Sequence, residues 1–127
     1  MSVRFAGYAA LFDKVDRGGD IVRRGAFARA LQGGSLPLLW QHRPMQRIGT
    51  VDYAAEDRRG LRVIATLDDA TEPLEALRSG AVTGLSFGYR VRRAHGKAPR
   101  ELFELDLVEV SLVTTPMMPG ARVHMLC

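Results

Sequence analysis

Cysteine is nearly absent from this sequence: its 127 residues contain a single one, Cys127. One cysteine cannot form an internal disulfide, so we expect a fold that does not depend on an oxidising compartment. Histidine is scarce too, and the three histidines are too far apart in the sequence to resemble a zinc-ligand pattern. The sequence therefore predicts neither a structural metal nor a cofactor.

Long hydrophobic runs are also missing. The longest run that we expect to be buried is Leu36 to Trp40, whereas a membrane helix needs about 20 apolar residues. The apolar stretch from Phe5 to Phe12 faintly resembles the hydrophobic region of a signal peptide, but no small-residue cleavage site follows it. We therefore expect a cytoplasmic protein with no membrane partner.

A concentrated positive surface is not evident, although the net charge is +4. Basic residues occur as scattered pairs, such as Arg23-Arg24, Arg58-Arg59 and Arg92-Arg93, and aromatic residues make up only 7% of the chain. Nucleic-acid-binding domains more often carry a basic stripe with interleaved aromatic residues. We expect no specific nucleic-acid partner. A small barrel that binds nucleic acid remains an alternative, and it would bind in a strongly salt-dependent way.

The length and the hydrophobic pattern favour one domain over residues 1–127, mainly β with flanking short helices (α+β). Alternating apolar residues, most clearly Leu61, Val63, Ala65 and Leu67, indicate short strands. A sheet of such strands would leave exposed edges unless it closed, so we expect a small closed antiparallel β-barrel. The strands are expected at 4–11, 36–41, 50–54, 61–67, 85–92, 102–114 and 123–126, and helical segments at 26–31 and 71–79.

Ser86 is the first candidate for chemistry. It lies between Leu85 and Phe87, and Gly88 removes a neighbouring side chain on the same strand face. Strand alternation places Ser86 on the polar face, where a substrate could reach it. The alternative is an ordinary surface serine beside a bulge glycine.

His42 and Glu109 are the second and third candidates. His42 ends an apolar run, and an imidazole there suits a general base because its ordinary pKa of about 6.5 is close to neutrality. Glu109 shares a strand face with apolar residues, so it needs a hydrogen-bonding or cationic partner. That partner is either an imidazole or an arginine. Ser111, on the same face, either supports Glu109 or is itself the nucleophile. His124 is a weaker alternative base.

Several stretches, taken in order, resemble the prohead proteases of tailed phages, the capsid-maturation serine proteases that are related in fold to the herpesvirus assemblins. The resemblance covers nearly the whole chain. Its stretches are Gly7-Tyr8-Ala9-Ala10-Leu11-Phe12-Asp13; Gly19-Asp20-Ile21-Val22 with Gly25-Ala26-Phe27 and Leu31; Leu38-Leu39-Trp40-Gln41-His42; Ile48-Gly49; Gly60-Leu61; Gly80 with Leu85-Ser86-Phe87-Gly88-Tyr89; and Glu109-Val110-Ser111-Leu112-Val113-Thr114 with Pro116.

This resemblance implies an assemblin-type barrel with Ser86 as nucleophile and His42 as general base. Glu109 falls where the assemblin relatives have a second histidine, so it is expected in the third catalytic role. The chain departs from the family where Pro116-Met117-Met118-Pro119 replaces an expected Pro-Ala-Asn-Pro. The departure leaves the oxyanion donors unassigned.

The resemblance also implies a serine endopeptidase that cleaves the scaffold and major capsid proteins inside the assembling prohead, in the host bacterial cytoplasm. A homodimer is possible by analogy with the assemblins. The alternative is a catalytically inactive, scaffold-like assembly protein that keeps the barrel. The origin is left open among a phage, a prophage and a gene transfer agent.

Overall fold

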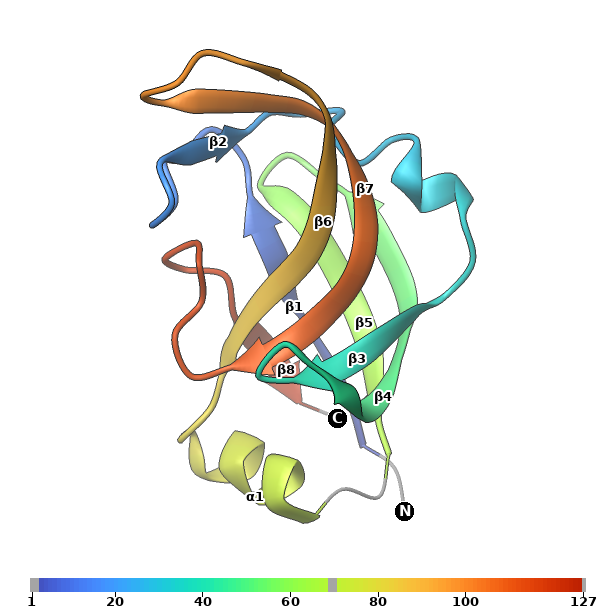
Figure 1. Ribbon diagram of the computed structural model, residues 1–127. Helices are drawn as coiled ribbons and strands as arrows, with labels where there is room; N and C mark the ends of the chain where they lie inside the picture. The colour runs from blue at the N-terminus through green and yellow to red at the C-terminus, as the bar shows by residue number, and fades with distance from the viewer. Residues whose placement is uncertain (1–2, 69–70, 127) are drawn as a thin grey trace.

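Eight β-strands, one α-helix and one 3-10 turn form the fold in the computed structural model, which describes residues 3–68 and 71–126 (Figure 1). Cys127 lies outside the described residues. The elements in chain order are β1 (Val3–Leu11), β2 (Asp20–Val22), η1 (Ala30–Gln32), β3 (Leu36–Trp40), β4 (Arg43–Glu56), β5 (Gly60–Leu67), α1 (Thr71–Ser79), β6 (Gly84–His95), β7 (Arg100–Val113) and β8 (Val123–Leu126).

The strands form one strongly curved sheet in the order β2-β7-β3-β4-β5-β1-β8, with β6 paired to β7. The long strand β7 pairs with three other strands. One of its edges pairs antiparallel with β6, and its other edge pairs parallel with β2 and β3. Figure 1 shows β6 and β7 curving together from the top of the molecule down to about the level of β8, with α1 below them.

The sheet is open, so the closed barrel expected from the sequence is not confirmed. The only strand-type link from β6 back to the β8 side, within 3–68 and 71–126, is an isolated bridge between Gly84 and Arg122. Backbone hydrogen bonds from Leu85 N to Ala121 O and from Val123 N to Thr83 O flank it, at 3.0 and 2.9 Å. The segment that approaches β6 is short and follows two prolines, which have no N–H to donate to a ladder.

Strand alternation was predicted correctly where one face is buried. In β5, Leu61, Val63, Ala65 and Leu67 are buried and the residues between them are partly exposed. The predicted helix at 71–79 is also confirmed, and Gly80, with φ of +81°, ends it. No helix in the described part of the chain is long and apolar enough to span a bilayer.

The segment 26–31 was expected to be helical, but only η1 forms there. Ala26 N and Ala28 N donate to carbonyls three residues back, so the segment makes tight turns. These turns direct Phe27 into the core, where its ring meets the ring of Phe87 edge-on at 5.3 Å. Burial of Phe27 thus overrides the weak helical pattern. No strand was expected at 20–22, where β2 forms because it pairs with β7.

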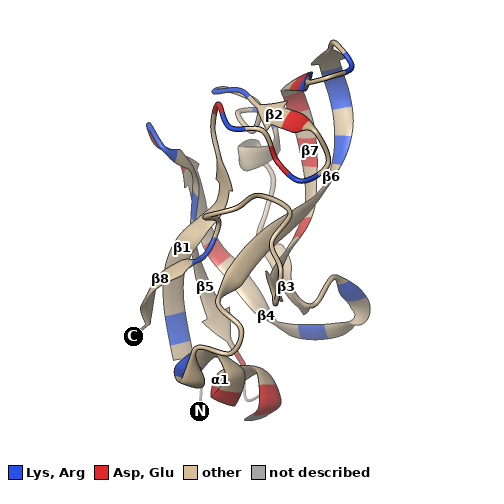
Figure 2. Ribbon diagram, turned by 90° about the vertical axis from the view of Figure 1, so that its left-hand side faces the viewer, with Lys and Arg blue, Asp and Glu red and all other residues tan. Residues whose placement is uncertain are grey.

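Charged residues are spread over several elements rather than gathered in one stripe (Figure 2). Acidic residues stand on β2 and on the facing part of β7, where Arg100 of β7 pairs with Asp20 of β2 at 2.9 Å. This scatter agrees with the pattern expected from the sequence.

Candidate active site

His42 is presented by a two-residue turn between β3 and β4. Trp40 and Arg43 are paired across the hairpin, which leaves Gln41 and His42 as the turn residues. Both have positive φ, 52° for Gln41 and 59° for His42. Such a pair of left-handed residues is typical of the type I′ hairpin turn, usually built from Gly, Asn or Asp. The sequence predicts that the chain leaves the strand here, whereas β4 starts immediately at Arg43.

Gln41 fixes this turn to the end of β7. Its Nε2 donates to Thr114 Oγ1 at 2.8 Å, and its Oε1 accepts from Thr114 N at 3.1 Å. Gln41 N also donates to Leu112 O at 2.9 Å. Three hydrogen bonds therefore hold a backbone conformation that a non-glycine residue adopts only at some cost. None of these contacts was anticipated, because a contact 73 residues away in sequence leaves no local signal.

Glu109 lies on β7 with its carboxylate against the imidazole of His42. The Nδ1 atom of His42 is 2.6 Å from Glu109 Oε1, and Glu109 is only 7% exposed. Of the partners left open by the sequence, the imidazole is therefore the one the structure provides. The hydrogen bond that His42 donates to Glu109 raises the pKa of His42, while partial burial opposes this. A neutral ring that donates from Nδ1 keeps Nε2 as a proton acceptor.

Ser111 links the same two residues. Its hydroxyl donates to Glu109 Oε2 at 2.6 Å and accepts the backbone N–H of His42 at 3.2 Å. The side chain has no exposed surface. Ser111 is therefore placed to support Glu109, and its burial argues against the alternative that it is the nucleophile.

Ser86 lies beside this group on β6. It is paired with Ser111 across the β6–β7 ladder, and two residues further on Gly88 is paired with Glu109. Ser86 and His42 both border one small cavity of about 80 Å3. No direct hydrogen bond joins their side chains among the residues described, which is common for catalytic groups without substrate.

Ser86 is more enclosed than strand alternation predicted. It is 4% exposed rather than on an open polar face. Ser86 is enclosed because other segments of the chain pack over it. Residues from β1, from the loop before β2 and from the loop after β7 cover this side of β6. The cavity wall consists of Ala9, Asp16, His42, Ser86, Phe87, Tyr89, Met117 and Met118.

The remaining histidines lie elsewhere. His124, on β8, packs against the ring of Tyr8 with centroids 5.7 Å apart and borders a different surface pocket. His95 ends β6 and is exposed. Neither borders the cavity at Ser86, so His42 is the imidazole that the fold brings to that serine.

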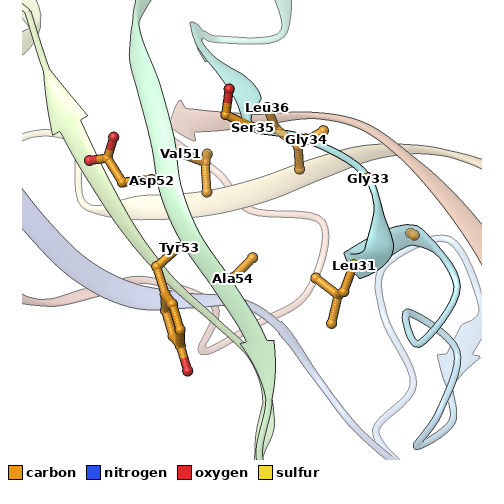
Figure 3. Close-up of a pocket in the computed structure, with 10 residues that line it drawn as sticks. Leu31, Gly33, Gly34, Ser35, Leu36, Val51, Asp52, Tyr53 and Ala54 are labelled. Atoms are coloured by element: carbon orange, nitrogen blue, oxygen red, sulfur yellow. The ribbon is translucent and has the colours of Figure 1, made fainter.

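A second and larger cavity, of about 280 Å3, lies between the segment before β3 and the middle of β4 (Figure 3). It is bordered by Ser35 and Asp52 but by no histidine, and it shares no residue with the cavity at Ser86. In Figure 3, the side chain of Tyr53 points away from Ser35. This cavity therefore lacks an imidazole beside its hydroxyl.

A hydroxyl, an imidazole and a carboxylate gathered on a mainly β scaffold are the features of a serine hydrolase. Within 3–68 and 71–126, no cluster of three or more His, Cys, Asp or Glu side chains is arranged to hold a metal ion. The arrangement points to proton transfer and nucleophilic attack by side chains.

Comparison with known proteins identifies the family. The chain matches the family described as Caudovirus prohead serine protease over residues 1–127, and it belongs to that family. It is 34% identical over 96 residues to the prohead protease of Enterobacteria phage HK97, a match that covers 70% of this chain and 43% of that protein. The chain thus spans less than half the length of this curated relative.

Two solved structures share the fold. Varicella-zoster virus protease aligns with a TM-score of 0.68 and 18% identity, covering 100% of this chain and 65% of that one. KSHV protease in complex with a hexapeptide phosphonate inhibitor aligns with a TM-score of 0.68 and 12% identity, covering 97% and 64%. The expected kinship in fold with the herpesvirus proteases is confirmed.

Proposed function

We propose that this chain is a serine endopeptidase in which Ser86 is the nucleophile, His42 the general base and Glu109 the group that orients His42. The observation that carries this proposal is the 2.6 Å contact of His42 Nδ1 with Glu109, made by a histidine that borders the same cavity as Ser86. Family membership supports the same reaction class.

The reaction proceeds through an acyl-enzyme. Nε2 of His42 takes the proton of the Ser86 hydroxyl as its oxygen attacks the scissile carbonyl, and the ring then gives a proton to the leaving amine. Water attacks the ester in the second half, again through His42, and frees Ser86. Glu109 holds the ring with Nε2 available and stabilises the imidazolium that forms in each half.

The substrates follow from the family. We propose that the enzyme cleaves the scaffold protein and the N-terminal segment of the major capsid protein within the immature shell, in the host cytoplasm. Residues 1–127 would form one domain that needs no cofactor, membrane or specific nucleic acid, and it could pair as a homodimer. High local concentration inside a shell would allow a slow enzyme to suffice.

Active-site labelling tests the assignment. The full chain is treated with an alkyl fluorophosphonate, and the modified residue is located by mass spectrometry. We expect an adduct on Ser86 that is lost in Ser86→Ala and strongly reduced in His42→Ala. The matched control is Ser111→Ala, which should still be labelled on Ser86. Labelling of another serine would overturn the assignment of the nucleophile.

Incubation of the chain with its cognate scaffold and major capsid proteins tests the substrate class. We expect Ser86→Ala to reduce cleavage by about 10⁴-fold or more. A wild-type chain that is neither labelled nor able to cleave these proteins would instead favour an inactive, scaffold-like assembly protein.

A further inference from the structure

The cavity beside Ser86 carries one carboxylate in an otherwise largely apolar wall. Asp16, from the loop between β1 and β2, borders it together with Ala9, Phe87 and Met117 among others. Because Ser86 and His42 also border this cavity, a peptide whose carbonyl reaches Ser86 would place the side chain next to the scissile bond inside it. Asp16 would then contact that side chain.

Asp16 is held rigidly in this position. Its Oδ1 accepts the backbone N–H groups of Gly18 at 2.8 Å and Asp20 at 3.0 Å. Its own backbone pairs with Asp20, with Asp16 N donating to Asp20 O at 2.8 Å. The loop therefore fixes one carboxylate oxygen, and Oδ2 makes no hydrogen bond to another described residue.

The carboxylate of Asp16 forms no ion pair within the described part of the chain, in contrast to its neighbour Asp20. Asp20 receives two hydrogen bonds from Arg100, at 3.0 and 2.9 Å, and a third from the hydroxyl of Tyr89. No Lys, Arg or His nitrogen described here lies within 4.0 Å of Asp16. The adjacent Arg17 donates to Pro116 O instead.

From this geometry we infer that Asp16 selects a basic side chain, with lysine favoured, on the substrate residue whose carbonyl Ser86 attacks. The inference rests on the proposed function of Ser86 and His42. A space of about 80 Å3 suits a narrow, unbranched side chain. The methylene stem of lysine would pack on the apolar wall while its ammonium group replaces the missing partner of Asp16.

Two phosphonate probes test this inference. They are peptidyl diphenyl phosphonates that are identical except for lysine or norleucine at the reacting residue. Ser86 oxygen forms a bond to phosphorus, phenoxide leaves, and the serine proton is carried by His42 to give phenol. We expect the lysine probe to react at least about tenfold faster with the wild-type chain, because a partly desolvated ion pair contributes at least that factor.

Substitution of Asp16 then separates charge from structure. Asp16→Asn should abolish the preference, and Asp16→Glu should retain part of it. The matched control is Asp13→Asn, which removes an equal charge from the same loop outside the cavity. Asn suits the left-handed backbone of Asp13, whose φ is 64°. The control should keep the full preference.

The outcomes distinguish the two proposals. An alkyl fluorophosphonate carries no substrate side chain, so its reaction with Ser86 tests the catalytic group alone. If it fails to label the wild-type chain, the proposed function fails. If it labels Ser86 while the two peptidyl probes react equally, or while Asp16→Asn keeps the lysine preference, only the role of Asp16 is overturned.

Salt provides a measurement that needs no variant. If Asp16→Asn does not fold, the ratio of lysine to norleucine reactivity in the wild-type chain should still fall as ionic strength rises, because salt screens a partly exposed ion pair. A ratio that does not change between low salt and about 1 M salt would overturn the inference.

Discussion

Gly88 lies directly opposite Glu109 in the β6–β7 ladder, and the absence of a side chain there makes room for the carboxylate that holds His42. A Cβ atom on Gly88 would lie 2.5 Å from Glu109 Oε1 and 3.1 Å from its Cδ. A glycine is therefore needed at position 88 because any larger residue would clash with Glu109. It is not needed for backbone conformation, since the φ of Gly88 is not in the left-handed region.

Gly88→Ala tests this space requirement. The added methyl group must push the Glu109 carboxylate away from the ring, so we expect kcat/KM to fall by about 10-fold or more while Ser86 remains in place. The matched control is Gly34→Ala, where an added Cβ meets nothing within 4 Å. Equal activity of Gly88→Ala and wild type, measured with a peptide substrate, would show that Glu109 is not confined by Gly88.

Glu109→Gln tests the orienting role through pH. The pKa of His42 is raised, chiefly by the hydrogen bond that its ring donates to Glu109. A general base works only when neutral, so wild-type activity should be lost, as the pH falls, at a pH above the ordinary histidine value of about 6.5. Glutamine carries no charge, so the acid limb of kcat/KM should move to lower pH and the plateau should fall by about 10²-fold or more. An unshifted limb would contradict the role of Glu109.

Ser111→Ala is expected to slow the enzyme without removing its nucleophile. The substitution leaves Glu109 Oε2 and the N–H of His42 without their present partner. Loss of such a buried hydrogen bond costs about 1–3 kcal/mol. We expect a roughly 10-fold decrease in kcat/KM with labelling still confined to Ser86, as measured by progress curves and mass spectrometry. Complete loss of labelling would reopen the assignment of the nucleophile.

Gln41→Leu tests whether the turn that carries His42 must be tied to Thr114. Leucine keeps the bulk of Gln41 but loses both side-chain hydrogen bonds to Thr114. We expect kcat to fall more than KM rises, because the position of His42 matters most in the transition state.

Thr114→Val, combined with Gln41→Leu, completes the double-mutant cycle for this contact. It removes only the hydroxyl that accepts from Gln41 Nε2. Since the two residues share that contact, their effects on kcat should be less than additive. Full additivity would argue against a shared role in holding His42.

Asp20→Asn should lower the free energy of unfolding by about 1–3 kcal/mol at pH 7, because the substitution removes a charge that Arg100 binds at two points. The pKa of Asp20 is lowered chiefly by Arg100. Its contribution is therefore present above the unfolded value of about 3.9 and is lost as the pH falls through the lower folded value.

Urea unfolding at pH 7 and at pH 3 measures this effect. The matched control is Asp106→Asn, which breaks a more exposed pair with Arg92 and should cost less than about 1 kcal/mol. A difference between Asp20→Asn and wild type that is the same at both pH values would contradict the ionic origin of the stabilisation.

The sequence was sufficient where neighbouring residues alone decide the structure. Alternation of apolar side chains located β5, and helix-forming residues closed by Gly80 located α1 with its observed bounds. The residue types of the candidate site could be selected in the same way. A carboxylate on a buried strand face requires a partner, and that physical cost singles out Glu109 from the residue pattern alone.

Contacts between distant segments could not be predicted in this way. The register of β6 against β7 sets Gly88 against Glu109 and Ser86 against Ser111, and the β3–β4 turn brings His42 to Glu109 across 67 residues of chain. The opening of the sheet depends on how few hydrogen bonds the segment after Pro119 can form with β6. The sequence by itself determined which side chains would need partners and where strands would form. Only the tertiary structure decided which partners they received, because that depends on the pairing and curvature of strands far apart in the chain.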